Sequence, residues 1–167
     1  MQVLTTRANA DADCDAEIVL SSELRAKARV LARTTAGEEV GIILARGGDP
    51  LCDGDVLTGS DGYRVRIRAA RESLLHVTCA DSTALARAAY HLGNRHVKLE
   101  VGNGWLRLAD DAVLAAMLVQ LGATVMPVED VFRPEHGAYG GGHHHSHGQD
   151  DDMHYAPRIH QFVSAER

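Results

Sequence analysis

Residues 74–128 contain two successive strand-helix-strand patterns, and this repetition restricts the fold more than any other feature of the chain. In both patterns, apolar residues at the three-to-four spacing of one helical face lie between short segments typical of strands. The expected elements are strands over 74–79, 97–101, 105–108 and 124–128, and helices over 81–92 and 111–121. The order β-α-β-β-α-β is that of the ferredoxin-like fold, in which both helices cover one face of an antiparallel sheet.

The first 70 residues show no helical period and predict a small all-β domain. Alternation over 24–33 and 63–69 and an apolar run over 39–46 are typical of strands, and glycine- and aspartate-rich stretches between them predict turns. Residues 6–17 are small and acidic, so we expect a loose or hairpin-like beginning. Because helical patterns appear only after Ala70, we expect domains over 1–70 and 71–134.

Histidine, glycine and acidic residues replace any apolar period after Pro134, which predicts a flexible, His-rich tail over 135–167. The expected fold class is therefore α+β: an all-β N-terminal domain, a ferredoxin-like βαββαβ domain and this tail. Several imidazoles on one flexible segment can wrap round a nickel, copper or zinc ion. The clustered tail histidines are His143, His144, His145 and His147, and the aspartates at 150–152 are either additional ligands or a solvated charge run.

The end of the first predicted helix presents a further candidate ligand, His96. Asp81 or Ser82 is the expected N-cap of this helix. Gly93 and Asn94 adopt the left-handed conformation most readily, so we expect them to end the helix and to fix the direction in which His96 leaves it. The negative end of the helix dipole favours a cation there, either imidazolium or a bound metal.

Composition argues against several classes of function. The net charge is -6 and the arginines are scattered, which argues against nucleic-acid binding. We find neither an apolar run of membrane-spanning length nor a secretory leader, so we expect a cytoplasmic protein without membrane association. The three cysteines form no C-x-x-C pair, and only Cys79 is kept as a minor metal-ligand candidate. Without H-E-x-x-H or a comparable spacing, a zinc hydrolase is not indicated and we expect no enzyme.

Residues 88–101, AAYHLGNRHVKLEV, resemble the family of the urease accessory protein UreE, a nickel metallochaperone. The family motif G-N-R-H is matched by Gly93, Asn94, Arg95 and His96. The resemblance continues in an R-G-x-x-L-x-D-G-D-like stretch over 46–55 and in P-E-x-G-A-Y-G over 134–140. It therefore extends over nearly the whole chain.

The resemblance implies a homodimer in which the two copies of His96 meet at the two-fold axis and hold one Ni(II) ion. It further implies delivery of nickel to the GTPase UreG and through it to the urease apoprotein complex, with Zn(II) or Cu(II) as competing ions. The N-terminal domain is described for this family as peptide-binding. Further candidate ligands are the tail residues His136 and His154 and, as auxiliaries, His91 and Cys79. The alternative function is a passive divalent-metal buffer or storage protein, in which the tail matters and His96 does not.

Overall fold

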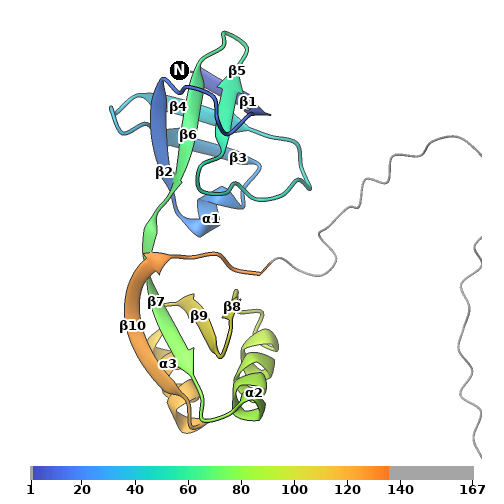
Figure 1. Ribbon diagram of the computed structural model, residues 1–167, viewed down its shortest axis with the longest axis vertical. Helices are drawn as coiled ribbons and strands as arrows, with labels where there is room; N and C mark the ends of the chain where they lie inside the picture. The colour runs from blue at the N-terminus through green and yellow to red at the C-terminus, as the bar shows by residue number, and fades with distance from the viewer. Residues whose placement is uncertain (1, 136–167) are drawn as a thin grey trace, which may run out of the picture.

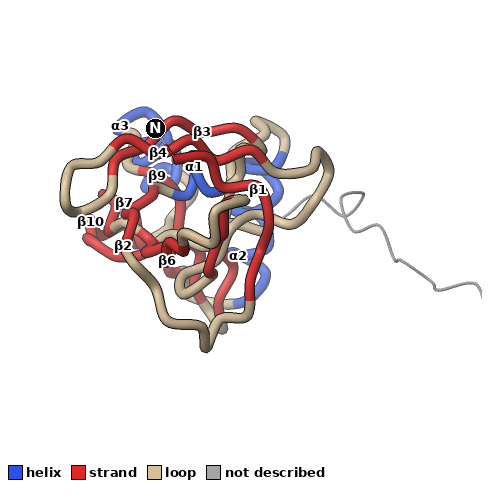
Figure 2. The backbone as a smooth tube through the Cα atoms, turned by 90° about the horizontal axis from the view of Figure 1, so that it is seen from above, coloured by secondary structure: helices blue, strands red, loops and turns tan. Residues whose placement is uncertain are grey.

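The computed structural model describes residues 2–135, which form two lobes stacked along the long axis of the molecule (Figure 1). Each lobe is built on its own sheet, and strands predominate over short helices throughout (Figure 2). The N-terminal lobe contains strands β1 (Gln2–Ala8), β2 (Ala16–Leu20), β3 (Arg29–Arg33), β4 (Glu39–Ile43), β5 (Val56–Gly59) and β6 (Arg64–Ala69), with one helical turn, α1 (Ser22–Arg25).

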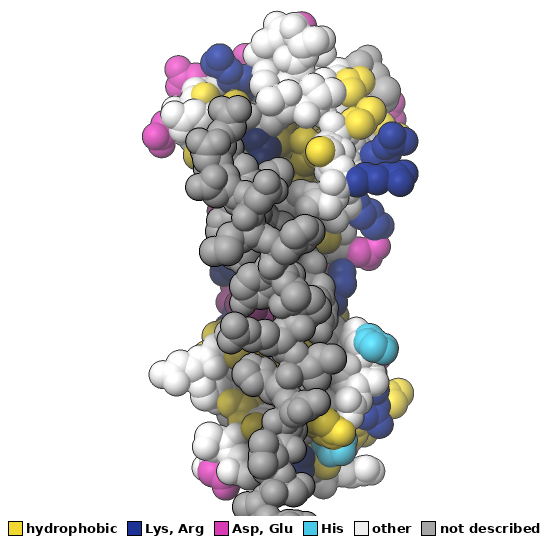
Figure 3. All heavy atoms as spheres, turned by 90° about the vertical axis from the view of Figure 1, so that its right-hand side faces the viewer, with side chains coloured by type: hydrophobic (Ala, Val, Ile, Leu, Met, Phe, Trp, Pro, Cys, Tyr) yellow, Lys and Arg dark blue, Asp and Glu magenta, His cyan; other side chains and the backbone are white. Residues whose placement is uncertain are grey.

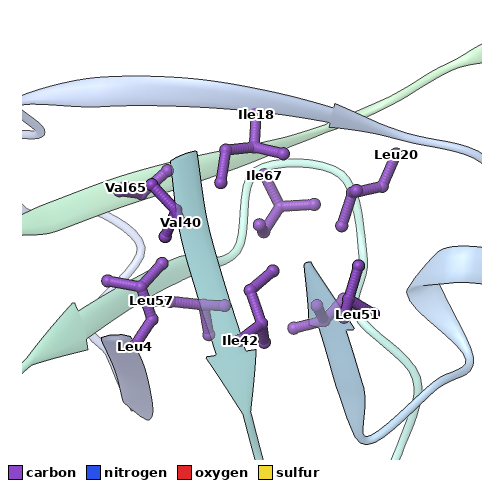
Figure 4. Close-up of a cluster of buried hydrophobic side chains, with 10 residues drawn as sticks. Leu4, Ile18, Leu20, Val40, Ile42, Leu51, Leu57, Val65 and Ile67 are labelled. Atoms are coloured by element: carbon purple, nitrogen blue, oxygen red, sulfur yellow. The ribbon is translucent and has the colours of Figure 1, made fainter. Parts of the chain in front are cut away.

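The six N-terminal strands form one sheet in the order β2-β6-β5-β1-β4-β3. Alternation decides which side chains are buried: in β6, Val65 and Ile67 are fully buried between exposed or half-buried arginines. Side chains from all six strands and from the loop before β5 converge on one core (Figure 4). Its buried members are Leu4, Ile18, Leu20, Val30, Val40, Ile42, Leu51, Leu57, Val65 and Ile67.

Two N-terminal expectations were wrong. Residues 6–17 were expected to form a loose or hairpin-like beginning, but 6–8 belong to β1 and 16–17 to β2, because β1 pairs with β4 and β5 and β2 pairs with β6, far along the chain. The alternation over 24–33 does not form one strand. Ser21 caps the turn of α1 by accepting a hydrogen bond from the Leu24 N–H, and β3 begins only at Arg29.

The C-terminal lobe follows the order expected from the two repeated patterns. Its elements are β7 (Arg71–Thr78), α2 (Ser82–Gly93), β8 (Glu100–Gly102), β9 (Trp105–Ala109), α3 (Ala112–Gln120) and β10 (Thr124–Val131). All strand pairs are antiparallel and the sheet order is β10-β7-β9-β8. Leu75 and Val77 of β7 pack in one cluster with Leu92 of α2 and Leu118 of α3, so both helices cover the same face of the sheet.

Strand β8 is shorter than expected and lies at the edge of the sheet. It covers only Glu100–Gly102, whereas the pattern predicted a strand over 97–101. Val101, within the predicted strand, is 54% exposed. The segment between α2 and β8 is thus a connection, and it carries His96.

Candidate metal site

His96 lies in a helix-terminating turn that has a specific hydrogen-bonding pattern. The His96 N–H donates to the Gly93 carbonyl at 2.9 Å, and the Val97 N–H donates to the Leu92 carbonyl at 3.2 Å. These two bonds are those of the Schellman motif, whose penultimate residue takes the left-handed conformation. That residue is His96, with φ of 55°, and it is the one non-glycine residue with positive φ among residues 2–135.

Helix α3 ends in the same way and provides an internal comparison. The Gly122 N–H donates to Val119 at 2.9 Å and the Ala123 N–H to Leu118 at 3.0 Å. Here the left-handed residue is glycine, with φ of 84°. A side chain in this conformation costs roughly 1–2 kcal/mol relative to the right-handed form. His96 thus occupies a position where the local fold favours glycine, and such strained residues cluster at functional sites.

The sequence pattern assigned the left-handed turn to the wrong residues. Asn94 has φ of -62°, and Gly93 is absent from the glycines with positive φ. Helix α2 continues through Gly93, because the N–H groups of residues 94–96 still donate hydrogen bonds to carbonyls of the helix. The N-cap was predicted correctly: the Asp81 carboxylate accepts a hydrogen bond from the Ala84 N–H at 2.8 Å.

The imidazole of His96 is exposed, and its neighbours hold the backbone rather than offering further ligands. The Arg95 guanidinium donates to the His91 carbonyl at 3.0 Å, which satisfies one of the unpaired carbonyls at the helix end. Within residues 2–135, no group of three or more histidine, cysteine, aspartate or glutamate side chains is arranged to hold a metal ion. In the described part of one chain, His96 therefore does not belong to a metal-binding group of three or more such side chains.

The tail begins close to this histidine. The Glu135 N–H donates to the Leu99 carbonyl at 2.6 Å, and the Arg133 N–H donates to the Glu100 carboxylate at 3.1 Å. Leu99 is three residues after His96, a span of about 10 Å in extended chain. The remaining candidate ligands, His136, His143, His144, His145, His147 and His154, lie outside the described residues.

The two auxiliary candidates differ in position. His91 lies on α2 and is half-buried, with its ring edge-on to Tyr90 at 5.6 Å between centroids. Cys79 precedes the other end of α2, and a helix of twelve residues is about 18 Å long, so Cys79 is far from His96. Burial, followed by the Asp81 charge, raises the pKa of the Cys79 thiol. A raised pKa disfavours the thiolate that binds metals.

Two apolar side chains that the sequence did not single out flank the helix end. Tyr90, one turn before Asn94, is 66% exposed, and Val101 on the edge strand is 54% exposed. The sequence pattern did not predict either exposure, because it depends on which edge of the domain remains uncovered. Figure 3 shows exposed histidine side chains on the C-terminal lobe, which contains every histidine of the described chain.

These features define a class: a two-domain protein with a strand-rich first domain and a second, helix-and-sheet domain that displays one strained, exposed histidine. Comparison with known families gives two matches that together extend over most of the chain. Residues 2–70 match the N-terminal domain model of the UreE urease accessory protein, and residues 72–161 match its C-terminal domain model.

Similar proteins are found under the same name along almost the full length. Urease accessory protein UreE of Azotobacter vinelandii is 59% identical over 97% of this chain and 98% of its own. UreE of Pseudomonas fluorescens strain Pf-5 is 56% identical, and UreE of Ectopseudomonas mendocina is 59% identical, over the same shares. The chain belongs to the UreE family of urease accessory proteins, which implies a role in urease maturation. Among the described residues, no helix is long and apolar enough to span a membrane.

Proposed function

We propose that this protein is a cytoplasmic nickel metallochaperone that binds Ni(II) between two copies of His96 and delivers it to the urease maturation machinery. The observation that carries the proposal is the exposed imidazole of His96 at a left-handed position where α3 has Gly122. Neutral imidazole is a suitable ligand for nickel, with copper and zinc as competitors. A strained residue with no structural benefit of its own needs a functional reason.

A homodimer supports this use of a single histidine. In an isologous interface, a residue near the two-fold axis lies opposite its own copy, so one histidine per chain becomes two ligands. The exposed Tyr90 and Val101 offer apolar surface for such an interface beside the helix end. His136 follows Glu135, whose N–H bonds to Leu99, and is the tail histidine best placed to add a ligand.

An incomplete ligand set suits a protein that must release its metal. Two imidazoles leave coordination positions that an acceptor can occupy before the donor ligands dissociate, whereas a closed four-ligand site retains its ion. The proposed acceptor is the GTPase UreG and, through it, the urease apoprotein complex. The tail histidines bind additional ions and load the paired site.

The experiment compares nickel delivery by three variants of the protein with that of the wild type at limiting nickel. His96→Gly removes the imidazole and suits the left-handed backbone, and truncation after Glu135 removes the tail histidines. His76→Gln is the matched control, because it removes an imidazole of the same domain whose Nδ1 accepts a hydrogen bond from Arg107 at 3.3 Å. We expect His96→Gly to bind nickel through its tail but to fail in transfer to UreG and in urease activation.

The same experiment distinguishes the alternative function. A passive metal buffer, or a chaperone that delivers from its tail, would lose activity on truncation and keep it in His96→Gly. Normal urease activation by a His96→Gly dimer would therefore refute the proposed role of His96. Loss of activation in His76→Gln of equal size would show that the effect is not specific to the helix end.

A further inference from the structure

Arg25 is a buried cation at the junction of the two domains. Its residue exposure is 7%, and its guanidinium donates to the Leu51 carbonyl at 3.2 Å and to the Phe132 carbonyl at 2.5 Å. Leu51 belongs to the N-terminal domain and Phe132 follows β10 of the C-terminal domain. Arg25 therefore joins the two lobes through neutral acceptors on both sides.

The charge of Arg25 has no acidic partner in the described chain. No carboxylate of residues 2–135 forms a salt bridge with Arg25, and its Nε is buried without a hydrogen-bond partner. A buried charge is normally paired, since removing an ion from water has an energetic cost that neutral carbonyls offset only in part. An anion close to this guanidinium would supply the missing compensation.

Arg25 lines a cleft between the domains that is large enough for a small molecule. The cleft has a volume of about 700 Å³, within the range of ligand sites. It is walled by the loop between β4 and β5 and by the segments before β8 and after β10. Its charged lining residues are Arg25, Lys98 and Arg133 and the acids Asp49, Asp53 and Glu135.

Most of these charges offset one another. Lys98, Arg133, Asp49 and Glu135 are all exposed, so solvent and salt screen the two signs alike. The Asp53 carboxylate already accepts a hydrogen bond from the Ala69 N–H at 2.8 Å. Asp53 is likewise exposed, so Arg25 is the one of these six charges that lies in the buried wall of the cleft, where the effective dielectric is lower than in water.

We propose that this interdomain cleft is a binding site for a small molecule carrying a carboxylate or phosphate oxyanion, with Arg25 as its central cation. Guanidinium is the side chain best suited to such groups, and Lys98 and Arg133 add donors from two other segments. Because Arg25 donates hydrogen bonds to both domains, a ligand beside it lies at the interface between them. Oxyanion binding in the cleft is independent of nickel delivery.

The test uses the full-length, metal-free protein at about pH 8, where histidines are largely neutral. Sodium phosphate and sodium acetate are titrated separately against sodium chloride of equal ionic strength, and backbone amide chemical shifts are followed. Gly47 and Gly48 line the cleft and are the reporters, and Gly122 at the far end of α3 is the control. We expect saturable shifts at the reporters with at least one oxyanion and none at Gly122.

Variants of charged residues at the rim test whether the oxyanion binds in this cleft. Lys98→Ala and Arg133→Ala should each weaken oxyanion binding about two- to fivefold, and Asp49→Asn should strengthen it by a similar factor. Arg25→Met should weaken binding by more than tenfold. If the Arg25→Met protein does not fold, the three rim variants decide whether the oxyanion binds in the cleft. Shifts equal to those in chloride, or affinities unaffected by the rim variants, would overturn the proposal.

Discussion

The backbone at the end of α2 leads to a prediction that reverses what its sequence indicates. Gly93 has no positive φ, and a methyl group placed on it would contact nothing within 4 Å. Gly93→Ala should therefore stabilise the C-terminal domain by about 0.5–1 kcal/mol, because glycine loses more conformational freedom on folding. Gly122→Ala places the same methyl group at φ of 84° and should destabilise it by about 1–2 kcal/mol.

The left-handed backbone also determines the order of stability of two variants at the position of His96. Its φ of 55° is left-handed, so glycine is unstrained there and alanine is not. We expect His96→Gly to be more stable than His96→Ala by about 1 kcal/mol, although both lack the imidazole. Because both variants lack the imidazole, its contribution to stability cancels when the two are compared with each other.

Urea unfolding of metal-free protein, followed by tryptophan fluorescence, measures these differences. Trp105 is the single tryptophan of the chain and lies on β9, so its emission reports on the C-terminal domain. All variants are compared at one protein concentration, because the proposed dimerisation would couple stability to concentration. If Gly93→Ala destabilised the domain as much as Gly122→Ala, the left-handed turn would be at Gly93 and the strain assigned to His96 would be refuted.

Three further outcomes are expected. Truncation after Glu135 should lower the nickel bound per dimer yet leave about one ion, measured by calorimetry, and a truncated dimer without nickel would contradict the two-place arrangement. Nickel affinity should fall as pH drops through about 6.5, because metal displaces protons from imidazole, and an affinity constant from pH 7.5 to 5.5 would indicate carboxylate ligands. Hydrogen bonds from the Val131 N–H and, secondarily, from Arg107 lower the pKa of Asp130 below its ordinary 3.8. The stability that ionised Asp130 gives to the fold should therefore be complete above pH 3.8 and lost as pH falls through the lowered pKa. Unfolding of Asp130→Asn alongside wild type checks this, and a difference that persisted at the lowest pH would contradict it.

The C-terminal domain was the more predictable part because its information is local. Its helices carry a period that one face of a sheet can bury, and Asp81 and Asp111 cap them through hydrogen bonds to the following turn. The N-terminal domain was less predictable since its strands pair across long separations, as β2 with β6 and β1 with β4. Alternation over 24–33 predicted one strand, but the capping by Ser21 stabilises a helical turn over Ser22–Arg25, and the strand begins only at Arg29.

The sequence by itself determined the family, through the motif over 93–96 and matches along the chain, and it singled out His96. It could not determine how that histidine is held, because glycine and asparagine tolerate the left-handed conformation without being required to adopt it. The packing of Leu92 and Val97 into the core, with the bonds between them, places the reversal at His96. The tertiary structure alone brought together Arg25, Lys98 and Arg133, because residues so far apart in sequence meet only when the two domains pack against each other.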